Sequence, residues 1–218
     1  MRNVALLTVL LATSPLFADE LVGLPPVVIL AENHLSSAHK QREQDFFKMP
    51  QVRAGYDCLF LEVGANFNEA LAAFGRSEAS YANTIENEIL RTQNSLGLPM
   101  RNNWSEEVLA AARASGLKLH AVEFDYLTTY AYELFHQPDL YRHIVERNAW
   151  MARNIGQLLS SGTCQRGILI VGSDHVQPWR GDAALSVQAF LKKLEIDSQV
   201  IDFENGSRRE PAPMPVDI

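Results

Sequence analysis

The sequence is poor in basic side chains: 19 lysines and arginines stand against 26 aspartates and glutamates, a formal net charge of −7. Nucleic acids and anionic membrane surfaces attract basic patches, so neither is expected as a partner. After the first twenty residues, no apolar run approaches the roughly 20 residues that a membrane-spanning helix needs, so we expect no stable membrane insertion. The chain is 47% hydrophobic and 21% charged, which is the balance of a globular protein.

Cysteine is also scarce, with only Cys58 and Cys164 in the chain. No cysteine lies close enough to the start to carry a lipid, and no C-x-x-C-H motif is present to attach haem covalently. Each cysteine stands just before an apolar run. If those runs form neighbouring strands that place the Cα atoms of the two cysteines within about 7 Å, the cysteines can form a disulfide in an exported protein. Otherwise both are buried free thiols.

The first residues have the pattern of a cleavable secretory signal. Arg2 supplies the positive charge, and the apolar core that follows it is too short to be a membrane anchor, which takes about 20 residues. We therefore expect a periplasmic or secreted protein, with a signal peptide at 1–18, a single domain at 19–205 and a proline-rich tail at 206–218.

Short apolar runs without clean alternation are typical of strands buried on both faces of a parallel sheet. Five such runs occur, at 26–32, 58–64, 117–125, 167–175 and 198–205. Helical patterns separate them, some beginning at a residue such as Ser36 or Ser105 that can cap a helix. Strands alternating with helices predict an α/β fold. We expect a mostly parallel central sheet of about five strands, flanked by helices, with a helical insertion at 67–116 after the second strand.

Ionisable side chains appear where these apolar runs stop. The first run ends in Glu32 and His34, the second in Glu62, the third in Glu123 and Asp125, and the fourth in Asp174 and His175. In open α/β sheets, ligands bind outside the carboxyl ends of the strands, so these groups are expected to meet at one rim. Histidines with carboxylates can bind a divalent metal, or can perform acid–base chemistry without one.

A basic partner for this rim comes from the longest predicted helix, at 140–162. Arg147, Met151 and Asn154 follow helical spacing there and lie on one stripe. An arginine on a packed face needs a carboxylate or an anionic ligand. The alternative is a surface arginine paired with Glu146 or another nearby acid.

Four short motifs occur in the order typical of one superfamily: "AENH" at 31–34, "FLEVG" at 60–64, "RNAWMARNI" at 147–155 and "ILIVGSDHV" at 168–176. Over about residues 27–180 the chain resembles the erythromycin esterase, ChaN and TIKI/TraB superfamily. Ala31 stands where the family pattern has a glycine. The resemblance implies an α/β core with a shared site formed by Glu32, His34, Glu62, Arg147 and His175.

The superfamily uses this site in more than one way, and the first use implied is hydrolysis of an ester or peptide bond in a small-molecule or peptide substrate. No serine or cysteine lies in a nucleophile-elbow pattern, so attack by activated water is favoured. Glu32, His34, Glu62 and His175 would either bind a divalent metal or act without one. Arg147 would stabilise the oxyanion.

The second use implied is that of a ChaN-like protein, which would bind haem or iron without turnover. Asp125 and Tyr126 would then contact the cofactor, and a histidine, Tyr126 or Tyr130 would be the axial ligand. His39, five residues after His34, is expected on a helix surface instead. A fold retained only for interaction with a partner is a third interpretation. The sequence does not indicate an oligomeric state.

Overall fold

The structure is a computed structural model that describes residues 24–99, 104–137, 140–178, 182–204 and 208–209. The expected signal peptide at 1–18 and most of the expected tail lie outside the described residues. Among the helices that are described, none combines the length and the apolar character needed to cross a membrane.

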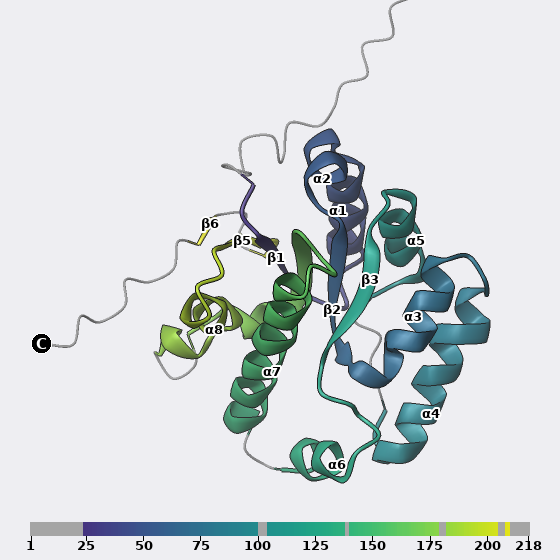
Figure 1. Ribbon diagram of the computed structural model, residues 1–218. Helices are drawn as coiled ribbons and strands as arrows, with labels where there is room; N and C mark the ends of the chain where they lie inside the picture. The colour runs from purple at the N-terminus through teal and green to yellow at the C-terminus, as the bar shows by residue number, and fades with distance from the viewer. Residues whose placement is uncertain (1–23, 100–103, 138–139, 179–181, 205–207, 210–218) are drawn as a thin grey trace, which may run out of the picture.

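Five parallel strands form the centre of the protein (Figure 1). They are β1 (Val27–Glu32), β2 (Cys58–Gly64), β3 (Lys118–Glu123), β4 (Gly167–Gly172) and β5 (Ser198–Asp202). A two-residue strand, β6 (Arg208–Arg209), pairs antiparallel with β5, which gives the order β3-β2-β4-β1-β5-β6. The predicted α/β class and five-stranded parallel sheet are confirmed. The short β6 falls in the stretch predicted to be a tail.

Helices cover both faces of the sheet (Figure 1). One layer holds α1 (Ser37–Lys48), α2 (Pro50–Gly55), α3 (Asn68–Gly75), α4 (Asn87–Leu96) and α5 (Glu106–Ala114); the other holds α7 (Leu140–Ser160) and α8 (Val187–Lys193). Leu59 and Leu61 of β2 pack into the first layer, whereas Cys58 and Phe60 pack into the second. Both faces of the strand are therefore buried, which explains why its sequence does not alternate.

The insertion after β2 is helical, as predicted. It contains α3, a π-helical turn at Ala82–Glu86, α4 and α5, and Ser105 caps α5 by accepting a hydrogen bond from the Val108 N–H. A short helix, α6 (Thr129–Phe135), follows β3. The ends of α4 and α6 reach the carboxyl rim of the sheet, where Leu96 and Phe135 line a pocket.

Cys58 and Cys164 form a disulfide, so the alternative of two free thiols does not hold. Cys58 begins β2, and Cys164 lies in the loop that leads into the neighbouring strand β4. Their Cα atoms are 5.9 Å apart. The starts of β2 and β4 lie side by side in the sheet, and this brings the two cysteines close enough for the disulfide bond to form.

Replacing both cysteines with alanine should lower the free energy of unfolding by about 4 kcal/mol. The disulfide closes a loop across 106 positions, and removing such a link frees the unfolded chain. Urea denaturation followed by circular dichroism measures the effect. The wild-type protein in a reducing agent serves as the control and should match the variant. An unfolding midpoint equal to that of the oxidised protein would contradict the prediction.

Candidate functional site

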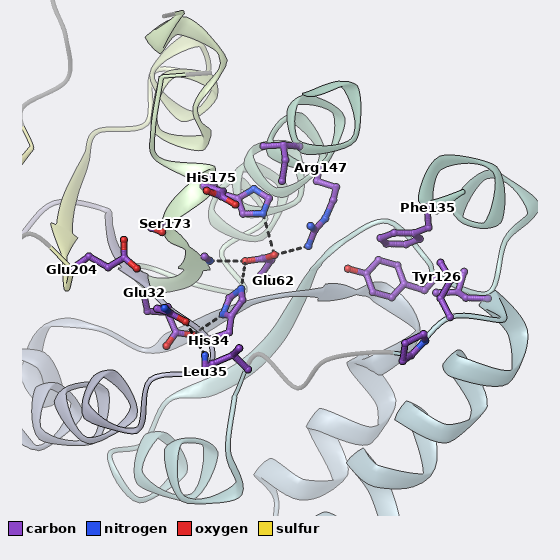
Figure 2. A pocket seen from close by; sticks show the side chains of 17 residues that line it. Glu32, His34, Leu35, Glu62, Tyr126, Phe135, Arg147, Ser173, His175 and Glu204 are labelled. Atoms are coloured by element: carbon purple, nitrogen blue, oxygen red, sulfur yellow. Dashed lines mark hydrogen bonds and ion pairs between the residues drawn. The ribbon is translucent and has the colours of Figure 1, made fainter. Parts of the chain in front are cut away.

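A pocket of about 550 Å³ opens at the carboxyl ends of β1, β2 and β4. One wall is polar and contains all five residues of the predicted shared site: Glu32, His34, Glu62, Arg147 and His175 (Figure 2). Another part of the lining is largely apolar: Leu96, Leu98, Tyr126, Phe135 and Ile144. The parallel strands therefore bring the predicted residues to one rim, beside a surface suited to an apolar ligand.

Glu62 lies at the centre of the polar wall (Figure 2). It follows Leu61, where the register between β2 and β3 shifts, and such an irregularity re-aims a side chain. Its carboxylate accepts hydrogen bonds from Arg147 Nη2 at 2.5 Å, His175 Nε2 at 3.0 Å and the Gly172 N–H at 2.7 Å. Burial by itself raises the pKa of Glu62, but the charges of His175 and Arg147 hold that pKa well below its usual value. Glu62 is therefore a fixed anion and a weak base.

Arg147 lies between two carboxylates, consistent with its expected place on a packed helix face. Its Nη2 is 2.5 Å from Glu62 Oε1 and 2.6 Å from Glu123 Oε1, and its Nε is 3.0 Å from both Glu123 oxygens. The Tyr126 hydroxyl donates to Glu123 Oε2 at 2.5 Å. Nη1 forms no hydrogen bond within the described residues, and Arg147 is one of the residues that line the pocket.

His34 and Glu32 form a hydrogen-bonded pair at the end of β1, with Nδ1 of His34 2.8 Å from Glu32 Oε1. His34 is the most exposed of the five predicted side chains, at 23%. Burial lowers its pKa, but hydrogen bonds to Glu32 and Glu62 outweigh burial and raise the pKa of His34 to about 9. A Cβ on Gly172 would lie 2.8 Å from His34 Nε2, so only glycine at 172 leaves room for this imidazole. His34 is thus an ionisable group presented to the pocket.

His175 is buried, with only 2% of its side chain exposed. It lies in a 3-10 turn that follows β4 rather than in the predicted strand. Its Nδ1 is 2.5 Å from Asn148 Oδ1, while its Nε2 faces Glu62. The Asn148 amide donates to the Leu185 carbonyl, which leaves its oxygen as the acceptor. Both ring nitrogens of His175 therefore face acceptors, and the ring holds Glu62 in place rather than contacting a ligand.

The two residues predicted to contact a cofactor have other partners. Asp125 is exposed, and its Oδ1 accepts a hydrogen bond from the Leu127 N–H in the turn after β3. Tyr126 lines the pocket, but its hydroxyl donates to Glu123, and burial followed by the Glu123 charge raises the pKa of Tyr126 well above its usual value. His39 lies on α1, as expected, and its Nδ1 accepts from the Asn33 N–H.

Lys40 and Glu43 of α1 do not line the pocket, but Lys40 holds Glu32 from behind it, and neither was predicted. Lys40 Nζ donates to both Glu32 oxygens, at 2.5 and 2.7 Å, and lies 3.8 Å from Glu43 Oε1. Glu43 is fully buried, and neither of its oxygens meets a donor among the described residues. Burial, and then contact with Glu32, raises the pKa of Glu43 to about 10. Two neighbouring carboxylates repel each other when both are ionised, which favours the protonated form of the buried Glu43.

Glu43→Gln should raise the free energy of unfolding at pH 8 by roughly 2 kcal/mol, and by much less at pH 5. The pKa of Glu43 is raised from the model-compound value of 4.5 to about 10. The unfolded chain therefore loses this proton near pH 4.5 while the folded protein keeps it, so stability falls as the pH rises between these values. Glutamine is neutral at every pH. Urea denaturation at both pH values measures the difference, with exposed Glu133→Gln as the control. An equal effect at both would contradict the account.

The two carboxylates among the residues predicted to bind a divalent metal already have cationic partners. Glu32 contacts Lys40 and His34, and Glu62 contacts Arg147 and His175. A divalent cation between these carboxylates would meet the charges of Lys40 and Arg147 at short range. The donor set therefore does not fit a divalent metal, and the chain's own cations neutralise the carboxylates instead.

Comparison with solved structures finds one with the same fold, described as "Cofacial heme binding to ChaN of Campylobacter jejuni". The TM-score is 0.52 with 15% sequence identity, over 82% of this chain and 81% of that one. The chain has a ChaN-like fold. No protein family and no curated protein matches the sequence. The likeness supports the ChaN-like part of the predicted resemblance, and it does not extend to the erythromycin esterases or TIKI-type proteins specifically.

Proposed function

We propose that the pocket is the active site of a hydrolase that activates water with the Glu32–His34 pair and needs no metal. The observation that carries this proposal is the 2.8 Å contact between His34 Nδ1 and Glu32 Oε1, with the imidazole partly exposed to the pocket. A carboxylate that accepts the Nδ1 hydrogen fixes the tautomer in which Nε2 can take a proton. The pair therefore has the arrangement of an oriented general base.

Each polar residue has a separate part in the proposed reaction. Neutral His34 takes a proton from water at Nε2, and the hydroxide so formed adds to the carbonyl carbon of the substrate. Arg147 donates from Nη1 to the oxyanion. His34 then returns the proton to the leaving group as the carbon–oxygen bond breaks. Glu62 and His175 keep Arg147 and His34 in position.

The pocket favours a small ester over a peptide. Its volume of about 550 Å³ falls within the range of roughly 300 to 1,000 Å³ that is usual for small-molecule sites. The apolar side chains of Leu96, Phe135 and Ile144 would pack against the body of the substrate. We also propose that the protein acts after export, on the pattern of residues 1–18. A panel of small aryl and alkyl esters tests the activity, and failure to hydrolyse any of them would contradict it.

The kcat/KM for such an ester should rise about tenfold per pH unit from pH 6 and level off near pH 9. The pKa of His34 is raised to about 9, so the imidazole is protonated and inactive as a base at lower pH. Initial rates across this range measure the profile, with circular dichroism to verify that the fold persists. A rate that falls between pH 8 and 10 would show instead that His34 acts as an acid.

Haem binding is the second candidate, and the observation that favours it is the ChaN-like fold together with the apolar lining of the pocket. A flat ring could pack there, but one of the predicted axial ligands, Tyr126, donates its hydroxyl to Glu123. His34, partly exposed to the pocket, is then the residue to test as the axial ligand. Haem titration distinguishes the two candidates. A Soret band that saturates at one equivalent and is lost in His34→Ala would put binding first.

A further inference from the structure

A second cluster of reactive side chains lies at the opposite end of the sheet from the pocket. Cys58 begins β2, His120 lies near the start of β3, and Cys164 precedes β4. One atom from each, the two Sγ atoms and a ring nitrogen of His120, lie within 4.8 Å of one another. The pairing of Phe60 with His120 in adjacent parallel strands places the imidazole on the same face as Cys58.

His120 has a buried ring nitrogen with no partner. Its Nε2 forms no hydrogen bond and is shielded from solvent. In its neutral form the imidazole offers a lone pair at such a nitrogen. A buried polar atom without a partner costs about 1 to 3 kcal/mol, and such atoms often mark a site for an ion or for redox chemistry.

Two thiolates and one neutral imidazole are a ligand set that suits zinc. Zinc sites with three protein ligands keep a fourth position for water. A pocket of about 590 Å³ lies beside His120, between β3 and α7, and is lined by polar groups that include Asn154, Gln157 and Ser161. This pocket borders His120.

We propose that, when the disulfide is reduced, Cys58, His120 and Cys164 bind one zinc ion in its place. A dithiol reductant would supply two electrons and two protons to the disulfide and would itself become a disulfide. Zinc would then displace the two thiol protons. Either link joins the start of β2 to the loop before β4, so zinc and the disulfide are alternative ways to hold the same two segments. The disulfide suits the oxidising compartment proposed for the exported protein, and zinc would replace it only where the two thiols are reduced.

The test is a titration of reduced, full-length protein with Co²⁺, a spectroscopic substitute for zinc, in the absence of oxygen. We expect thiolate-to-cobalt absorption that saturates at one equivalent, and none with the disulfide intact. His120→Ala should weaken binding by at least about tenfold. His136→Ala, at an exposed histidine, is the matched control and should have no effect.

Circular dichroism and thermal unfolding in the same samples keep the test decisive. If the reduced chain is folded, zinc should raise its melting temperature, and His120→Ala should reduce that rise. If the reduced chain is unfolded, zinc should restore the folded spectrum in the wild type and not in His120→Ala. Failure of the reduced protein to bind Co²⁺, or equal binding by wild type and His120→Ala, would overturn the proposal.

Discussion

His34→Ala should lower kcat/KM for an ester substrate by about a thousandfold, the effect expected when a general base is removed. The substitution removes the proton acceptor while leaving Glu32 paired with Lys40. His34 is partly exposed, at 23%, so the fold should survive its loss. Initial rates at pH 9, where the wild type is most active, give the largest contrast.

His136→Ala is a suitable control for this experiment, because His136 is exposed and does not line the pocket. Its activity should equal that of the wild type. Glu32→Gln should lie between the two, since an amide can orient the imidazole but cannot stabilise its charge. A loss of less than tenfold in His34→Ala would show that another group takes the proton.

Arg147→Met should lower the free energy of unfolding by about 3 to 5 kcal/mol, because it leaves two buried carboxylates without their cation. Arg147 donates to both Glu62 and Glu123, which are 4% and 0% exposed. Methionine fills similar space but carries no charge. Urea denaturation measures the loss, and hydrolysis should fall as well because the oxyanion donor is gone.

Arg153→Met provides the matched control on the same helix. Arg153 is exposed and lies over the ring of Trp150, with 5.5 Å between the guanidinium carbon and the ring centroid. Its substitution should change stability by less than about 0.5 kcal/mol. Adding Glu123→Gln to Arg147→Met should recover part of the lost stability, because one unpaired charge is then removed. Equal stabilities of the Arg147 and Arg153 variants would contradict the ion-pair account.

The sheet and the meeting of Glu32, His34, Glu62 and His175 at one rim were predictable because parallel strands place their carboxyl ends on one edge. Arg147 lies on a helix and was assigned from its helical stripe and from the family resemblance. Glu32 and Glu62 could be assigned to that edge from the apolar runs that they end. His175 could be assigned to the rim in the same way, but not to its turn, because the hydrophobic pattern does not show where pairing between strands stops.

Residues from helices were harder to predict, because their contacts depend on how each helix packs. Lys40 and Glu43 lie in a charged stretch that looks exposed. One signal was present: Glu43 precedes Phe46 and Phe47 by three and four positions, which puts it on the buried stripe of α1. The metal-site hypothesis did not take this helix into account, and Lys40 Nζ donates to both oxygens of Glu32.

The most direct test of the central claim is ester hydrolysis by protein with an intact disulfide that has been dialysed against a chelator. If Glu32 and His34 activate water on their own, kcat/KM will be the same before and after metal removal, and added zinc or magnesium will not change it. Loss of activity on dialysis, with recovery on adding back a divalent metal, would contradict the account.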